Sequence, residues 1–161
     1  MTATKAKTGG KQPEGKRVLV RNRRAFHEYQ ILESWEAGLV LLGSEVKSLR
    51  EGGASLDESY LRFDGDELFW VKGHIPEFRH SSGFLNHEPR RKRKVLLRKS
   101  QLNKLRAQVQ QKGFTLVPLD IHLTDRGLIK LELGLARGKK LADKRQAERS
   151  RQDRRDIRDL A

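Results

Sequence analysis

Residues 114–135 have the sequence FTLVPLDIHLTDRGLIKLELGL, and this stretch indicates a β fold. On both sides of the turn at 125–127, leucine and isoleucine alternate with polar residues. Successive side chains of a strand point to opposite faces, so this alternation is typical of half-buried strands. The stretch therefore predicts an antiparallel hairpin with strands over 114–123 and 128–135.

A second hairpin is predicted at 60–71, where two apolar runs flank Asp64-Gly65-Asp66-Glu67. Ser44 has the composition of a helix N-cap, and the short helix that follows should end at Gly52-Gly53. The other predicted elements are a strand-like segment over 26–35, a turn at 36–38, a short buried segment over 39–42, a strand starting at 95–97 and a helix over 100–112.

About six short strands with small helices predict a mainly β protein, a small antiparallel β-barrel. The 161 residues suit one domain and a tail. We expect a disordered basic N-terminus over 1–17, the barrel domain over 18–136, and a basic C-terminal tail over 137–161. The tail lacks an apolar face and should be disordered when free and helical against a polyanion. The chain has no cysteine, which excludes disulfides, thiolate zinc sites and cysteine nucleophiles.

The net charge of +14 is distributed unevenly along the chain. Residues 1–24 carry +7, residues 25–89 carry −7, residues 90–136 carry +9 and the remainder carries +5. A surplus of this size indicates a polyanionic partner. A membrane-surface helix needs a continuous apolar face, which the tail does not offer, so nucleic acid is favoured.

The densest basic run is Arg90-Arg91-Lys92-Arg93-Lys94, followed after three apolar residues by Arg98-Lys99. Its place at the mouth of a predicted strand favours a phosphate-binding patch. Solvated surface or a plain loop remains an alternative interpretation of such a run.

Catalytic and metal signatures are weak in this sequence. It has no Gly-x-Ser-x-Gly elbow, no phosphate loop and no dinucleotide glycine pattern. Asp64, Asp66 and Glu67 are conceivable Mg²⁺ ligands of a nuclease, but Asp-Gly serves a hairpin turn in its own right. We expect no enzyme, no metal site and no cofactor. The five histidines are scattered, at 27, 74, 80, 87 and 122, and the aromatic residues Trp35, Trp70, Phe63, Phe69 and Phe78 fit a core better than a base-stacking surface.

Six motifs together resemble the SsrA-binding protein (small protein B) family, in order and with the expected spacing from about residue 18 onward. They are NRRAFHEY at 22–29, EAG at 36–38, GSEVKSLR at 43–50, NHEPRR at 86–91, QKGFTLVPL at 111–119, and GLARGKK at 134–140 with DKR at 143–145.

The resemblance implies an oligonucleotide-binding-like barrel in the bacterial cytoplasm. It implies binding of the tRNA-like domain of transfer-messenger RNA and its delivery to ribosomes stalled on mRNA without a stop codon. The body would replace the lower half of a tRNA near the decoding centre, and the tail would enter the empty mRNA channel as a helix. We expect a monomer with no catalytic step. A general ribosomal or RNA-chaperone-type protein is the alternative that the charge alone leaves open.

The family motifs and the basic run together nominate the site residues. Glu36 could instead cap a turn, and Leu96 could instead lie in the core. The candidate RNA-binding residues are Glu36, Lys47, Arg50, Asn86, Arg90, Arg91, Arg93, Lys94, Leu96, Arg98 and Lys130, and the candidate ribosome-binding tail residues are Gly138, Lys139, Lys140, Asp143, Lys144 and Arg145.

Overall fold

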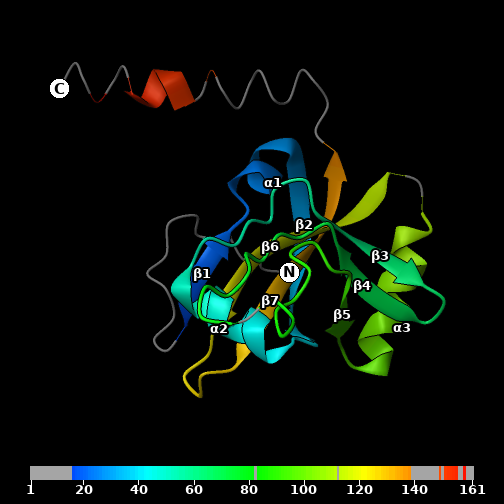
Figure 1. Cartoon of the computed structure of the whole chain (residues 1–161). Helices are drawn as coiled ribbons and strands as arrows, with labels where there is room; N and C mark the ends of the chain where they lie inside the picture. Colours follow the sequence, from blue (N-terminus) through cyan, green and yellow to red (C-terminus); the bar gives the residue numbers. More distant parts are fainter. Residues whose placement is uncertain are drawn as a thin grey trace.

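The computed structural model describes residues 16–138 without 82 and 112, together with 149, 151–155 and 158. Figure 1 shows a curved sheet with small helices around it. The elements in chain order are β1 (Arg17–Arg21), α1 (Arg23–Glu28), β2 (Tyr29–Leu39), α2 (Gly43–Glu51), β3 (Tyr60–Asp64), β4 (Glu67–Val71), β5 (Arg93–Leu96), α3 (Lys99–Val109), β6 (Phe114–Leu123) and β7 (Ile129–Gly138).

The strands form one seven-stranded sheet in the order β1-β6-β7-β2-β5-β4-β3, with antiparallel neighbours throughout. The sheet curls so that β3 approaches β6, but no hydrogen-bonded pairing joins these two strands in the described part of the chain. The prediction of a mainly β, antiparallel fold with small helices is confirmed. No helix among the described residues is long and apolar enough to cross a membrane.

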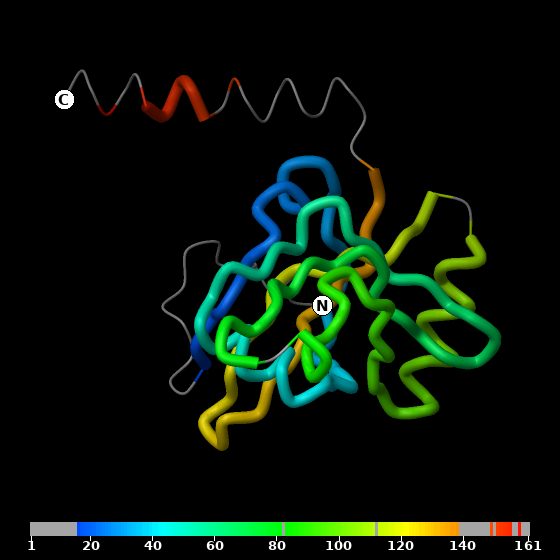
Figure 2. The backbone as a smooth tube through the Cα atoms, viewed as in Figure 1, coloured from blue at the N-terminus to red at the C-terminus, as the bar shows by residue number. Residues whose placement is uncertain are grey.

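Both predicted hairpins are present. Gly127 and Gly65 lie in the two turns with φ of 76° and 61°, a backbone region that favours glycine. Figure 2 shows the β6–β7 turn next to α2, and there Arg50 Nη2 of α2 lies 3.4 Å from the carbonyl oxygen of Gly127. At the boundaries, β1 begins at Arg17 and β7 continues to Gly138, so both strands extend slightly into the predicted N-terminal and tail segments.

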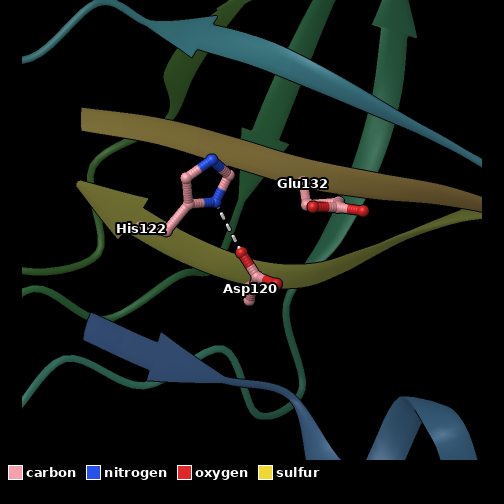
Figure 3. Close-up of side chains that lie close together, drawn as sticks. All are labelled: Asp120, His122 and Glu132. Carbon is pink, nitrogen blue, oxygen red and sulfur yellow. Dashed lines mark hydrogen bonds and ion pairs between the residues drawn. The ribbon is translucent and has the colours of Figure 1, made fainter. Parts of the chain in front are cut away.

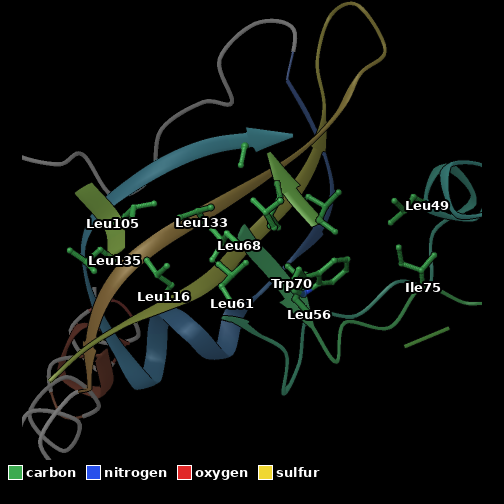
Figure 4. Close-up of a cluster of buried hydrophobic side chains, with 14 residues drawn as sticks. Leu49, Leu56, Leu61, Leu68, Trp70, Ile75, Leu105, Leu116, Leu133 and Leu135 are labelled. Atoms are coloured by element: carbon green, nitrogen blue, oxygen red, sulfur yellow. The ribbon is translucent and has the colours of Figure 1, made fainter. Parts of the chain in front are cut away.

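The core lies on the concave side of the sheet, where large side chains from six strands and two helices meet (Figure 4). Trp70 and Ile121 have no exposed surface, and Leu131 and Leu133 alternate inward as predicted. Trp70 packs so close to Gly73 that a Cβ there would lie 1.9 Å from Cζ2 of the indole. Trp35 and Phe63 also pack on the core, which confirms the core interpretation for three of the five aromatic residues.

The structure corrects the predicted turn at 36–38, because these residues belong to the long strand β2. Ala37 is buried opposite Leu131, and Gly38 lies against Leu96 of β5. A Cβ at Gly38 would come within 3.3 Å of the Leu96 Cβ, so the glycine permits a close strand approach rather than a turn. The segment 39–42 is also not buried as predicted, since Val40 and Leu42 are about half exposed.

The beginnings of two helices also differ from the predictions. The strand-like segment over 26–35 starts with the helix α1, where the Asn22 side chain accepts a hydrogen bond from the Ala25 backbone N–H. Helix α2 has Leu42 rather than Ser44 as its N-cap residue. Glu45 accepts from the Leu42 N–H, and Ser44 instead meets Nδ1 of His87 at 2.9 Å.

Candidate nucleic-acid interface

The convex face of the sheet carries two neighbouring rows of cross-strand partners. In one row Glu36 of β2 lies opposite Glu132 of β7, which lies opposite Asp120 of β6. The next row crosses β5, β2, β7 and β6 and consists, in that order, of Leu96, Gly38, Lys130 and His122. Cross-strand partners project from the same face of a sheet, so these side chains share one surface.

A hollow of about 580 Å³ opens on this surface, and we call it the sheet-face hollow. It contains the side chains of an acid, two cations, a glutamine and two leucines. Four predicted RNA-binding residues, separated by up to 94 positions in the sequence, therefore meet at one place. Its lining residues are Glu36, Gly38, Leu96, Leu97, Arg98, Gln101 and Lys130.

The positions of Leu96 and Glu36 exclude two alternative interpretations of the sequence, a core position for Leu96 and a turn-capping role for Glu36. Leu96 is 48% exposed, whereas its neighbour Val95 points into the core, so Leu96 is a surface residue. Glu36 lies within a strand and caps no turn.

The carboxylate of Glu36 is held by a residue that the sequence analysis did not nominate. His122 Nε2 lies 2.9 Å from Glu36 Oε2, and His122 Nδ1 lies 2.7 Å from Asp120 Oδ1. His122 has no exposed surface, while the Glu36 side chain is 52% exposed. The spacing Asp-x-His on a predicted strand was the available signal, because it places both side chains on the same face.

Asp120, His122 and Glu132 also form a group of potential metal ligands, whose donor atoms lie within 4.8 Å of one another (Figure 3). The ammonium of Lys16 lies 2.6 Å from Glu132 Oε2 and 3.8 Å from Asp120 Oδ2. Both imidazole nitrogens already face carboxylate oxygens. Since a lysine occupies the cation position and neither ring nitrogen is free, we assign no metal to this group.

Arg93 is a correction to the predicted phosphate-binding patch. Its side chain has no exposed surface, and its guanidinium lies 5.1 Å from the Trp70 ring. Arg93 donates to the carboxylate of Glu45 and to the carbonyl oxygens of Gly73 and Pro89. A guanidinium enclosed in this way holds the protein together and offers no surface to a phosphate.

Glu45 lies at the centre of this buried charge network. Burial alone raises the pKa of the Glu45 carboxyl, but hydrogen bonds from Arg91, from the Leu42 N–H and from Arg93 outweigh it, so the pKa lies below its ordinary value. Arg91 reaches Glu45 Oε1 at 2.6 Å and is itself partly buried. Two of the five cations in the basic run are thus committed to one internal acid.

Two further cations of the run, Lys92 and Lys94, lie beside the β3–β4 turn. Lys94 meets Glu67 at 3.1 Å, Lys92 meets Asp64 at 3.0 Å, and Arg106 of α3 meets Asp66 at 2.8 Å. The hydrogen bond from Lys92 holds the pKa of Asp64 below its usual range. Each carboxylate of the conceivable Mg²⁺ group therefore has its own cation partner.

The remaining RNA-binding candidates lie outside the hollow. Lys47 and Arg50 are exposed on α2, with Lys47 Nζ 5.6 Å from the Phe78 ring centroid. Arg90 is exposed and donates to the Lys72 carbonyl oxygen. The side-chain oxygen of Asn86 accepts a hydrogen bond from the Phe78 N–H, and its amide nitrogen donates to the Phe78 carbonyl oxygen. These two bonds close the loop between Phe78 and Asn86.

The predicted tail is only partly described. Gly138 is the last residue of β7 and pairs with Tyr29. Residues 151–155 are helical. Lys139, Lys140, Asp143, Lys144 and Arg145 lie outside the described residues.

Comparison with known proteins confirms the resemblance seen in the motifs. The family model described as SmpB protein matches residues 19–161. The chain belongs to the SmpB protein family. Within this family, the SsrA-binding protein of Agrobacterium fabrum is 49% identical over 142 residues, 88% of each chain. That of Arthrobacter sp. is 48% identical over 143 residues, 88% of this chain and 90% of the relative.

A solved structure extends the comparison to three dimensions. The SmpB-family fold of this chain matches a chain described as "tmRNA-SmpB: a journey to the center of the bacterial ribosome". The TM-score is 0.65 at 48% identity, and the match covers 81% of this chain and 94% of the other.

Proposed function

We propose that this protein binds the tRNA-like domain of transfer-messenger RNA and delivers it to stalled ribosomes for trans-translation. The observation that carries the proposal is the match, at 48% identity, to a solved chain described with tmRNA and the bacterial ribosome. The SmpB family match over residues 19–161 supports it.

The sheet-face hollow suits an RNA whose bases are partly unstacked. Sequence-specific RNA recognition favours loops with exposed base edges, while phosphate contacts fix position. The Glu36 carboxylate accepts hydrogen bonds from base N–H groups, and Leu96 offers an apolar surface to a base. Arg98 and Lys130 supply cations at the rim for phosphates.

We also propose that the sheet forms an oligonucleotide-binding-like barrel of six strands, with β1 added at the edge of β6. The approach of β3 to β6 supports this assignment. We infer a barrel domain over 18–136 and a tail over 137–161 that occupies the empty mRNA channel. Its residues Gly138, Lys139, Lys140, Asp143, Lys144 and Arg145 face ribosomal RNA there. The protein acts in the cytoplasm as a monomer, without a catalytic step or cofactor.

Reconstituted translation of an mRNA without a stop codon tests this function. With alanyl transfer-messenger RNA present, adding the full chain should attach the encoded tag to the stalled product. A protein that binds RNA without selectivity yields no tagged product. Absence of the tag would therefore favour the general RNA-chaperone role.

A further inference from the structure

Three hydrogen-bonded side chains form a line from β6 to Glu36 of β2, which lies in the sheet-face hollow. Asp120 is nearly buried, His122 has no exposed surface, and the Glu36 side chain is 52% exposed. The imidazole joins the two acids, at 2.7 Å from Asp120 and 2.9 Å from Glu36. Carboxylate oxygens only accept hydrogen bonds, so a ring N–H supplies the bond to Glu36.

The line of side chains holds Glu36 in a position that repulsion between neighbouring carboxylates of the sheet disfavours. Glu36 is the direct cross-strand partner of Glu132, and Glu132 is that of Asp120. Like charges that face each other across a strand pair repel, so the Glu36 carboxylate left alone would turn away from Glu132. Lys16 neutralises Glu132, and His122 reaches across β7 to hold Glu36.

We propose that His122, itself oriented by Asp120, is the positioning residue that fixes the Glu36 carboxylate for RNA recognition. This inference rests on the proposed function. The imidazole occupies Oε2 of Glu36 and leaves Oε1 to accept from the N–H edge of an unpaired base. A carboxylate repels phosphate, so a fixed one at this point selects a base edge over backbone.

Fixing the side chain before RNA arrives also strengthens binding. A free glutamate loses rotamer entropy when it is ordered on a ligand, and a side chain already held in place avoids that loss. The two bonds of His122 thus convert a mobile surface acid into a preorganised acceptor.

Two matched variants separate positioning from a structural role. In His122→Gln the side-chain amide nitrogen can take the place of Nε2 and still donate to Glu36. In His122→Asn it can take the place of Nδ1, so the bond to Asp120 remains and Glu36 is released. Both side chains are neutral amides at the same buried position.

The test measures dissociation constants of full-length variants for the tRNA-like domain of transfer-messenger RNA. His122→Asn and Glu36→Gln should each weaken binding about tenfold, while His122→Gln retains most of the affinity. The double variant E36Q/H122N should bind no worse than E36Q, because both changes remove the same contact. Glu33→Gln, on the same strand but paired with Lys104, is the control for loss of one carboxylate.

The inference is overturned if H122N weakens binding by the same factor with and without E36Q, or if H122N and H122Q bind alike. It is also overturned if E36Q binds like the wild type. These outcomes differ from failure of the proposed function, in which the wild-type chain itself does not prefer this RNA over bulk tRNA. If the asparagine variant unfolds while the glutamine variant folds and binds, H122Q is compared with E36Q/H122Q. The inference then requires that E36Q removes the RNA affinity that H122Q retains.

Discussion

Arg93 donates a hydrogen bond from Nε to the carboxylate of Glu45, and neither side chain has any exposed surface. The pair joins β5 to α2, and Arg93 also donates to the carbonyl oxygens of Gly73 and Pro89. Taking both charges out of water costs free energy, which their mutual bond and the other hydrogen bonds of the two side chains offset. The pair is therefore a point at which a single change strongly destabilises the fold.

Glu45→Gln should lower the free energy of unfolding by about 3–5 kcal/mol, because it leaves Arg93 buried without a counter-charge. Urea unfolding at pH 7 measures the effect. Glu51→Gln, on the exposed side of α2, is the matched control and should change stability by about 0.5 kcal/mol or less. Equal unfolding midpoints for the two variants would contradict this account of the pair.

The depressed pKa of Glu45 gives stability a defined dependence on pH. The folded state favours the ionised carboxyl, so the unfolded state binds the extra proton first as pH falls below the ordinary value of 4.5. The contribution of Glu45 is complete above that value and is lost as pH falls through the folded-state pKa. Urea midpoints between pH 3 and pH 7 should vary less in E45Q than in the wild type. A curve of unchanged steepness would show that other groups control acid unfolding.

Lys130→Gln should weaken RNA binding and lower the slope of log K against log salt by about 1, because one phosphate contact is lost. Lys94→Gln removes a charge that Glu67 already neutralises, at 3.1 Å, and should change the slope much less. Binding titrations at several salt concentrations give both slopes. A larger change for K94Q would place the phosphate track on β5 rather than in the hollow.

Gly73→Ala should destabilise the protein by about 1–3 kcal/mol or more, because its Cβ would lie 1.9 Å from Cζ2 of Trp70. Gly43→Ala is the control, since no atom lies within 4 Å of a Cβ at that position. Thermal unfolding compares the two variants. If G73A melts together with G43A, the indole has room to move.

A chain cut after Gly138 keeps β7 whole and should bind the tRNA-like domain as the full chain does. It should fail to support tagging on stalled ribosomes, because residues 139–161, all but the first two of the proposed channel-binding tail, are gone. Binding assays and reconstituted tagging reactions test the two halves of this prediction separately. Loss of RNA binding in the cut chain would show that the tail belongs to the RNA site.

The sequence predicted those parts of the structure that depend on local signals. Both hairpins have alternating apolar residues around a glycine-containing turn, and both are present. The segment 36–38 was wrongly predicted to be a turn, because a glycine can permit either a turn or the close approach of two strands. Its true role depends on Leu96, a partner 58 positions later in the sequence.

The site was predictable in outline but not in its charge pairing. Glu36, Leu96 and Lys130 were nominated, and they share one hollow. Arg93 has the same sequence character as its basic neighbours, and only contact with Glu45 reveals that it is internal. His122 went unnoticed because its partner Glu36 lies 86 positions earlier and two strands away.

The proposed function requires selective recognition of the tRNA-like domain, and competition binding measures this selectivity. The labelled domain is held by the wild-type chain at about 0.15 M salt and challenged with excess bulk tRNA. Contacts to phosphate alone are blind to sequence and fall steeply with salt. The labelled domain should stay bound. Complete displacement by bulk tRNA would contradict the proposed function and show that binding follows the charge of +14 alone.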